Sequence, residues 1–453
     1  MTGRYRAYAE YKNSGVEWIG DIPTDWDMWK IAHACPYVAS GTTPKSDDDL
    51  YYGGDNLWIT TGELRESVIF DTQKKVTDKA LTDMSTLRLH PKGSVAIAMY
   101  GATIGRLGIL GKDATTNQAC CVMPPSSVLH NRYLFYWLYA VRQEIINLSS
   151  GGGQPNVNQE KIASLKVSAP IYRLQEKIAN FLDHETAKID TLIEKQQQLI
   201  KLLKEKRQAV ISHAVTKGLN PNTPTRDSGV EWLGEVPAHW IVGRYKFCTN
   251  RIVVGIAEAA THAYADTGIP IIRSTNIREE GLDASGMLFI KKEFAEKNDS
   301  KYLYANDVIT VRTGYPGISA VIPQDLDRSQ CFTNLVASPR KNMVSEFLAE
   351  YLNSHTGKSY FDLLGWGSAQ KNISVPILQN IPIAYPDENE QVRIVKFVKE
   401  QRNRYTYLVE KAELQIQLLQ ERRTALISAA VTGKIDARDW QAPSQTTNQM
   451  IAA

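Results

Sequence analysis

The sequence is poor in cysteine and has no long apolar run. Its 453 residues include 5 cysteines (Cys35, Cys120, Cys121, Cys248 and Cys331), and none of them forms a Cys-x-x-Cys pair. An odd number of cysteines without metal-ligand spacing argues against a disulfide framework and against a zinc site. No stretch approaches the roughly 18 apolar residues of a membrane span, and residues 1–11 lack the apolar core of a signal peptide. We therefore expect a cytoplasmic protein without membrane contact.

A strong charge of either sign is also lacking. The net charge is +3, with 43% hydrophobic and 22% charged residues, which is ordinary for a globular protein and excludes a mainly disordered chain. A mildly basic balance permits a nucleic-acid partner without requiring one. The length is enough for about three domains of roughly 150 residues.

The usual catalytic motifs are missing as well. Pro124-Pro125 is flanked by Met123 and Ser126, so it lacks the polar and aromatic neighbours of an adenine methyltransferase loop. The segment 105–113 has a P-loop spacing that is one residue too long, and Asp113 stands where Mg²⁺ needs Ser or Thr. There is no His-Glu-x-x-His and no Gly-x-Ser-x-Gly. We expect no catalytic residue, metal or cofactor in this chain.

What the sequence does contain is a repeat. Residues 14–26 read SGVEWIGDIPTDW and residues 228–240 read SGVEWLGEVPAHW, with 8 of 13 positions identical at an offset of 214. Residues 192–216 match residues 408–432 at an offset of 216, and Gln175 matches Gln391 at the same offset. Chance does not keep the offset within 214 to 216 over so many residues. The chain is therefore two copies of one unit whose end segments are similar and whose middle segments have diverged.

Each copy closes with a long predicted helix. No Gly or Pro interrupts residues 179–214 or 388–432, and apolar residues recur there at alternating steps of 3 and 4, as in a coiled coil. We expect the two helices to pack antiparallel on each other; the alternative is two unrelated amphipathic helices, each buried in its own domain. The predicted contact residues are Ile189, Leu192, Leu199, Leu203, Val210, Leu408, Leu419 and Leu426.

Two similar heads joined by a helical rod suit a target with two separated sites. Duplex DNA is such a target, because its grooves recur every 34–36 Å or so along one face. The divergent middle segments would then recognise two different half-sites, while the similar end segments would provide the same scaffold for both. Short apolar runs beside glycine-rich turns, such as residues 93–100 and 306–312, predict α/β (α+β) heads.

The repeated SGVEW-[IL]-G-[DE]-[IV]-P segment and the repeated helices with LL-x-E-[KR]-R and IS-x-A-V-T resemble the specificity subunit of Type I restriction-modification systems, over roughly residues 11–436. The resemblance implies two target-recognition domains that read a bipartite DNA sequence. It also implies two modification subunits as partners, which use S-adenosylmethionine, and restriction subunits that use ATP with Mg²⁺. This chain itself would be a non-catalytic DNA-specificity subunit with a role in host defence.

On this reading the chain divides at predicted boundaries. Residues 1–175 form the first recognition domain, 176–220 a central helical spacer, 221–390 the second recognition domain, 391–436 a distal helical spacer, and 437–453 a flexible tail. One alternative is a self-contained DNA methyltransferase or nuclease with duplicated recognition domains. Another is a two-headed protein adaptor without a DNA role.

Base reading needs side chains with paired donors and acceptors on loops held by a scaffold. Glycine-punctuated segments in both copies carry such residues; those recurring in both copies could instead fix structure or bind phosphate, and the two lysines suit phosphates. The candidates are Thr42, Thr43, Lys45, Tyr100, Thr103, Arg106, Gln154 and Asn156 in the first copy, and Arg273, Ser274, Asn276, Arg312, Thr313, Tyr315, Gln370, Lys371 and Asn372 in the second.

Overall fold

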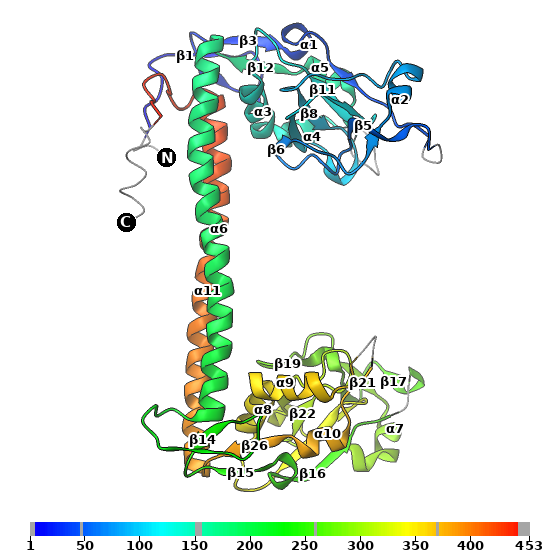
Figure 1. Ribbon diagram of the computed structural model, residues 1–453, viewed down its shortest axis with the longest axis vertical. Coiled ribbons are helices and arrows are strands. Elements are labelled where there is room, and N and C mark those ends of the chain that lie inside the picture. The colour runs from blue at the N-terminus through cyan, green and yellow to red at the C-terminus, as the bar shows by residue number, and fades with distance from the viewer. Residues whose placement is uncertain (1–4, 46–48, 150–155, 258–260, 368–370, 443–453) are drawn as a thin grey trace. The chain divides into compact units, whose positions relative to one another are not determined.

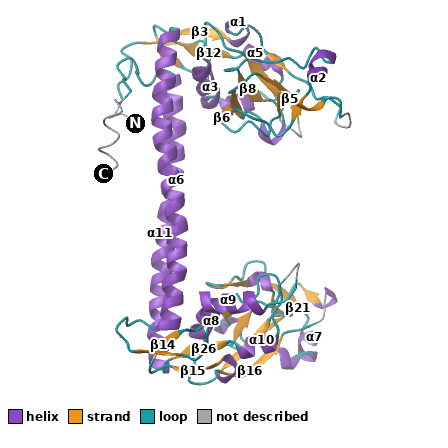
Figure 2. Cartoon of the chain, viewed as in Figure 1, coloured by secondary structure: helices purple, strands orange, loops and turns teal. Residues whose placement is uncertain are grey.

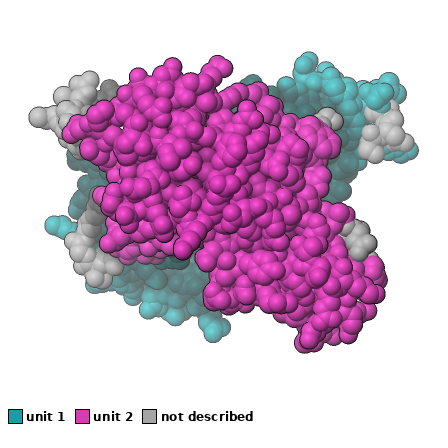
Figure 3. Space-filling model, turned by 90° about the horizontal axis from the view of Figure 1, so that it is seen from below, with its two compact units in different colours: residues 1–195, 415–453 teal, residues 196–414 magenta. Residues whose placement is uncertain are grey.

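The computed structural model describes residues 5–45, 49–149, 156–257, 261–367 and 371–442. The chain forms two compact units, coloured separately in Figure 3: unit 1 is Met1–Lys195 with Gln415–Ala453, and unit 2 is Gln196–Leu414. Two long helices, α6 (Tyr172–Lys217) and α11 (Glu388–Val431), each contribute a segment to both units. The expected mixed α/β fold is confirmed.

Unit 1 is built on a mixed five-stranded sheet of order β4-β11-β8-β9-β6 and a three-stranded sheet of order β10-β5-β7. Figure 1 labels the main helices and strands of the chain, and Figure 2 colours them by type. Two strand pairs, β1-β2 and β12-β3, complete its sheets in the described part. The strands are β1 (Tyr11–Asn13), β2 (Asp21–Pro23), β3 (Asp27–Lys30), β4 (Ala39–Ser40), β5 (Tyr52–Ile59), β6 (Ser67–Ile69), β7 (Lys75–Val76), β8 (Val95–Ala98), β9 (Leu107–Leu110), β10 (Ala114–Thr116), β11 (Cys120–Met123) and β12 (Lys166–Ala169). The short helices are α1 (Ile31–Ala34), α2 (Asp78–Asp83), α3 (Asn131–Ala140), α4 (Arg142–Asn147) and α5 (Gln159–Ser164).

Unit 2 has a related plan with two four-stranded sheets, of order β16-β25-β22-β23 and β17-β21-β18-β24, and pairs β13-β14, β15-β26 and β19-β20. The strands are β13 (Thr225–Asp227), β14 (Glu235–Pro237), β15 (Ile241–Arg244), β16 (Thr249–Val254), β17 (Tyr264–Ala265), β18 (Ile269–Ile272), β19 (Ile277–Arg278), β20 (Gly281–Leu282), β21 (Leu288–Ile290), β22 (Val308–Thr310), β23 (Ser319–Val321), β24 (Gln330–Cys331), β25 (Leu335–Pro339) and β26 (Pro382–Tyr385). The short helices are α7 (Lys292–Lys297), α8 (Ser345–Asn353), α9 (His355–Leu364) and α10 (Val375–Asn380).

The sheet registers show that the repeat extends through the diverged middles. In unit 1 β10 pairs in parallel with β5, with Thr116 opposite Ile59; in unit 2 β24 pairs in parallel with β18, with Cys331 opposite Ile272. These partners are related by offsets of 215 and 213. The two middles therefore share one fold, although short insertions and deletions shift their alignment by a few residues.

Recurring residues hold equivalent positions in the two cores. Trp26 and Trp240 are fully buried, in separate hydrophobic clusters. The side-chain oxygen of Gln175 accepts from the His130 backbone N–H at 2.9 Å, and that of Gln391 accepts from the Val344 N–H at 2.9 Å. Burial of a large aromatic and full use of a buried amide explain why these residues recur.

The long helices pack side by side and antiparallel within each unit. In unit 1 Arg423 Nε of α11 donates to Asp190 Oδ1 of α6 at 2.9 Å, and the Lys177 ammonium reaches the Arg438 carbonyl beyond α11. The contact residue opposite α6 position 190 is 423, and opposite α6 position 177 it is 438. Residue numbers therefore rise along one segment as they fall along the other, so the two run antiparallel. In unit 2 the last turns of α6 share a hydrophobic cluster with the first turns of α11.

The predicted contact residues of these helices fall into two sets. Ile189, Leu419 and Leu426 are buried, and Leu203 and Val210 are half-buried; Leu192, Leu199 and Leu408 are exposed. The covered positions of α6 are instead Ile189, Ile193, Gln196, Ile200, Leu203, Arg207 and Val210, and those of α11 are Tyr405, Val409, Ala412, Ile416, Leu419, Arg423 and Leu426. For Leu192, Leu199 and Leu408, the covered residue is instead the next one along the helix. In each case two adjacent apolar residues both fit the 3-4 spacing.

His90 is a buried titratable group in unit 1. Its Nδ1 lies 3.1 Å from the Tyr37 hydroxyl, and Arg88 lies over the Tyr37 ring. Burial, with a smaller contribution from the Arg88 charge, lowers the pKa of His90 to about 4. The unfolded chain, with an ordinary histidine pKa of about 6.5, therefore binds more protons than the folded chain as the pH falls from 6.5 towards 4.

We expect this difference to cost unit 1 about 2 kcal/mol of stability between pH 7.5 and pH 5. His90→Asn removes the titrating group while leaving Tyr37 a polar partner, so the variant should not show this part of the pH dependence. Denaturant unfolding at both pH values measures it, with the exposed His33→Asn as the control. An unchanged pH dependence in His90→Asn would show that His90 does not carry the acid sensitivity.

Candidate nucleic-acid interface

In unit 1, the loop after β8 meets the segment before α5. Tyr100 and Asn156 form an isolated antiparallel bridge, and the Val157 N–H donates to the Met99 carbonyl at 3.0 Å. Thr103 Oγ1 donates to the Tyr100 carbonyl at 3.2 Å within the same loop. Arg106 is exposed at the end of the loop. Four predicted residues, Tyr100, Thr103, Arg106 and Asn156, therefore belong to this one junction.

Unit 2 contains the same junction after β22. Thr313 and Asn372 form an isolated antiparallel bridge, and the Ile373 N–H donates to the Arg312 carbonyl at 3.0 Å. The Thr313 hydroxyl also donates to the Asn372 side-chain oxygen. Tyr315 is 82% exposed in this loop. Asn156 and Asn372 thus hold matching places in the two units.

The matched backbone carries different side chains in the two units. Arg312 occupies the place of Met99, since both carbonyls accept from the segment that returns to them. Met99 is buried, whereas Arg312 is half-buried with its Nε enclosed and without a hydrogen-bond partner in the described part of the chain. The carbonyl of Arg106 corresponds to that of Ile318, because they accept from Ala98 and Val311 at 2.8 Å. The sequence did not predict this shifted equivalence.

Two glycines allow each loop to approach a neighbouring helix. Gly105 has a φ of +76°, and a Cβ there would lie 2.8 Å from Arg142 Cγ. Gly317 has a φ of +97°, and a Cβ there would lie 2.4 Å from Phe361 Cδ2. Larger residues at these positions would push the loops away from the scaffold that positions them.

A salt bridge between two side chains lies beside each loop. Arg142 Nη2 lies 2.5 Å from Glu66 Oε1 in unit 1, and Lys358 Nζ lies 2.6 Å from Glu279 Oε1 in unit 2. The four residues are related by offsets of 213 and 216. Sequence reasoning missed these pairs, because the two offsets differ and nothing in the sequence marks the partners as neighbours.

The predicted segment 41–45 contacts the end of β10. The Thr42 N–H donates to the Thr116 carbonyl at 3.1 Å, and a Cβ on Gly41 would lie 1.8 Å from that carbonyl oxygen. Thr43 Oγ1 donates to Gln118 Oε1 at 2.5 Å, while Lys45 is exposed. Residues 41–45 follow β4, which belongs to the same sheet as the strand β8 before Tyr100, and they contact the end of β10 in the other sheet.

The predicted residues after β18 are engaged in their own turn. The Arg273 N–H donates to Asn276 Oδ1 at 3.1 Å, and Asn276 Nδ2 donates to the Asp283 carbonyl at 2.9 Å. Ser274 Oγ donates to Asn334 Oδ1 at 2.8 Å. Asn276 is buried, so its amide shapes the turn, whereas Arg273 and Ser274 stay partly exposed.

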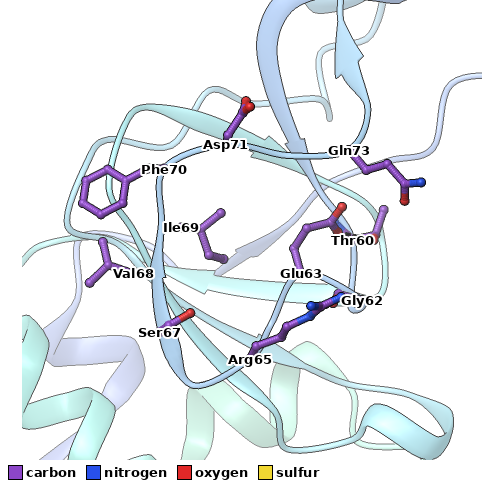
Figure 4. A pocket seen from close by; sticks show the side chains of 10 residues that line it. All are labelled: Thr60, Gly62, Glu63, Arg65, Ser67, Val68, Ile69, Phe70, Asp71 and Gln73. Carbon is purple, nitrogen blue, oxygen red and sulfur yellow. Dashed lines mark hydrogen bonds between the residues drawn. The ribbon is translucent and has the colours of Figure 1, made fainter. Parts of the chain in front are cut away.

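The matching turn of unit 1 borders a polar cavity of about 570 Å³ (Figure 4). The loop from Thr60 to Gln73 surrounds it, and Glu63 accepts from the Thr60 N–H at 2.9 Å. Asp71 lies 3.0 Å from Lys75 Nζ, and this partner lowers the pKa of the Asp71 carboxyl. In unit 2 Arg273 takes the place of Thr60 and donates to the Gly286 carbonyl at 2.9 Å.

The remaining expectations concern residues or groups that the structure does not test. Gln154 and Gln370 lie outside the described residues. Lys371 Nζ lies 2.9 Å from Asp362 Oδ1, so it carries a local partner. Within the described ranges no cluster of three or more His, Cys, Asp or Glu could hold a metal ion, and no helix is long and apolar enough to cross a membrane. All five cysteines are free and buried.

The fold and these loops define a duplicated α/β protein that presents one loop junction per unit on a common scaffold. A model of the Type I restriction modification DNA specificity domain matches residues 23–202 and 258–418. The chain belongs to this family.

Known proteins resemble the chain, several of them over most of its length. It is 22% identical to the Type I restriction enzyme MjaVIII specificity subunit of Methanocaldococcus jannaschii over 92% of this chain and 95% of the relative. The MjaIX specificity subunit of the same organism is 30% identical over 45% of this chain and 46% of the relative. The HsdS subunit from Thermoanaerobacter tengcongensis has a similar fold, with a TM-score of 0.53 and 14% identity over 91% of this chain and 98% of that chain. A chain from a structure of a type I R-M system assembly has a TM-score of 0.63 and 15% identity, covering 91% and 99%.

Proposed function

We propose that this chain is the DNA-specificity subunit of a Type I restriction-modification complex. Each unit reads one half of a bipartite duplex target, and the chain itself is non-catalytic. One observation carries the proposal: the junctions Tyr100–Asn156 and Thr313–Asn372 share a backbone arrangement but differ in side chains. A duplicated scaffold with diverged loops supports the recognition of two unlike half-sites.

The partners follow from the same proposal. Two modification subunits dock on the chain, bind S-adenosylmethionine and methylate the DNA, and restriction subunits add ATP- and Mg²⁺-dependent cleavage. Membership of the specificity-domain family and the likeness to an assembled type I R-M system support this division of labour. The chain determines which sequence is modified.

The half-site assignment is tested by one substitution in each unit. We expect Arg312→Met, which installs the residue of the equivalent unit 1 position, to relax the preference at the second half-site by about 5- to 150-fold, or about 1–3 kcal/mol. The first half-site should stay unchanged. Arg106→Ala should have the converse effect, because this exposed arginine belongs to the unit 1 loop. Methylome sequencing of hosts carrying each variant with the cognate modification subunit measures both.

Purified chain alone separates this proposal from its alternatives. It should transfer no methyl group from S-adenosylmethionine to DNA, whereas a self-contained methyltransferase would. Duplexes with both half-sites should bind in a salt-dependent manner, with Arg or Lys contacts to phosphates setting the slope. A protein adaptor without a DNA role would show no preference among duplex sequences.

A further inference from the structure

Unit 2 has a mostly apolar groove beside the last turns of α6. Its lining side chains come from α6, from the residues that follow it, and from Phe397 of α11, and the groove has a volume of about 410 Å³. Phe397 is only half-buried. The lining is Lys206, Ala209, Val210, His213, Ala214, Gly218, Leu219 and Phe397.

The matching place in unit 1 is filled. Phe181 corresponds to Phe397 at the repeat offset of 216, and it is 2% exposed. The Tyr5 ring packs edge-on against Phe181 with centroids 5.4 Å apart, and the Trp440 ring does the same at 5.8 Å. Tyr5 OH also donates to Glu185 Oε2 at 3.0 Å. Two aromatic rings therefore cover Phe181 in unit 1, whereas no aromatic ring of the described residues packs on Phe397 in unit 2.

The chain's connectivity explains the difference. In unit 1 the covering residues belong to two separate segments, one before β1 and one after α11, tied together by the Asp436 N–H donating to the Arg6 carbonyl at 2.8 Å. In unit 2 a single link, residues 218–224, joins α6 to β13. Leu219 is its residue that lines the groove. This short link joins the two elements and contributes no aromatic side chain that could pack over Phe397.

The charges at the groove indicate the chemistry of its occupant. Lys206 and His213 are the polar side chains of its lining, and none of the lining residues is acidic. In unit 1 the residue before the covering Trp440 is Asp439. If an aromatic residue next to an acidic one bound here, the ring would pack on Phe397 and Val210. The carboxylate would then lie near Lys206.

We propose that the unit 2 groove receives an aromatic side chain, flanked by a carboxylate, from a modification subunit. This rests on the proposed function, because it names a docking point for a partner of that complex. It also makes the two docking positions on the chain unequal: the groove of unit 1 is filled by the chain's own Tyr5 and Trp440, and that of unit 2 by the partner.

Filling the groove from within tests the proposal on the full chain. Ala209 is exposed, so Ala209→Trp should fold and place an indole where the partner's ring would bind. We expect at least a 10-fold weaker affinity for one of two modification subunits, measured by native mass spectrometry with purified cognate modification subunit. Lys204→Trp, on the opposite face of α6, is the matched control and should bind both subunits as the natural chain does.

A fluorescent label provides a second readout that does not depend on affinity. The native cysteines are all buried, so His213→Cys offers one accessible thiol for bimane, a dye that tyrosine and tryptophan quench on contact. Addition of the modification subunit should quench the label. Binding of two subunits without quenching, or with full affinity in Ala209→Trp, would overturn the docking proposal alone. Failure of the natural chain to bind any modification subunit would overturn the proposed function as well.

Discussion

Lengthening both long helices by seven residues should shift the preferred spacer of the DNA target by about three base pairs. Seven residues add about 10.5 Å of helix, and base pairs are stacked about 3.4 Å apart. Duplication of residues 192–198 in α6 and of residues 408–414 in α11 preserves the 3-4 spacing of the covered positions. Both half-site preferences should be unchanged, because no residue of either candidate recognition loop is altered.

The effect on the original target should be large. A duplex with the natural spacer could then engage only one unit at a time, and loss of two-site engagement costs about 10²- to 10⁴-fold in affinity. Selection of duplexes with randomised spacers by the assembled methyltransferase measures the shift. Seven residues inserted into the link 218–224 serve as the control and should leave the spacer alone. A change in half-site preference, or an unchanged spacer, would contradict a helical ruler.

Residues 1–220 alone should form a symmetric dimer. In unit 1 Arg423 donates to Asp190 at 2.9 Å, and Arg423 corresponds to Arg207 at the repeat offset. Two copies of α6 packed antiparallel would therefore form the Asp190–Arg207 pair twice, along a seam that contains Ile193 and Ile200. The fragment leaves this seam uncovered as a monomer, and exposure of such a stripe to water favours association.

The dimer should bind a palindromic target built from two copies of the first half-site. Light scattering after size-exclusion chromatography measures its mass, and duplex selection measures its target. Arg207→Glu should weaken the dimer by placing like charges opposite each other, and adding Asp190→Lys should restore it. A strictly monomeric fragment would contradict the equivalence of the two helices.

The spacing of apolar residues predicted both long helices, but only five of the eight predicted contact residues are covered in the structure. Leu192 and Ile193 are adjacent, as are Leu199 and Ile200, and either member of each pair satisfies a 3-4 repeat. In the structure Ile193 and Ile200 are half-covered while the leucines face solvent. The direction from which the partner helix approaches decides between them, and this direction is not written in one helix alone.

The candidate reading loops show a similar division. Glycine-punctuated segments after apolar runs were recognisable, and the structure brings Tyr100 to Asn156 and Thr313 to Asn372. Whether these residues contact DNA stays a prediction. The turn at Asn276 could not be anticipated, because only its folded neighbours reveal that its buried amide is already used by Arg273 and Asp283.

By itself, the sequence determined that the chain is a duplicated unit with paired long helices, because identity at a constant offset and uninterrupted helical periodicity are local properties. Tertiary structure alone decided that the diverged middles share one register, that Arg312 replaces Met99, and that one helical groove is capped by Tyr5 and Trp440 while its counterpart stays open. Such equivalences depend on backbone hydrogen bonds between distant segments, and insertions of one or two residues hide them from any comparison of letters.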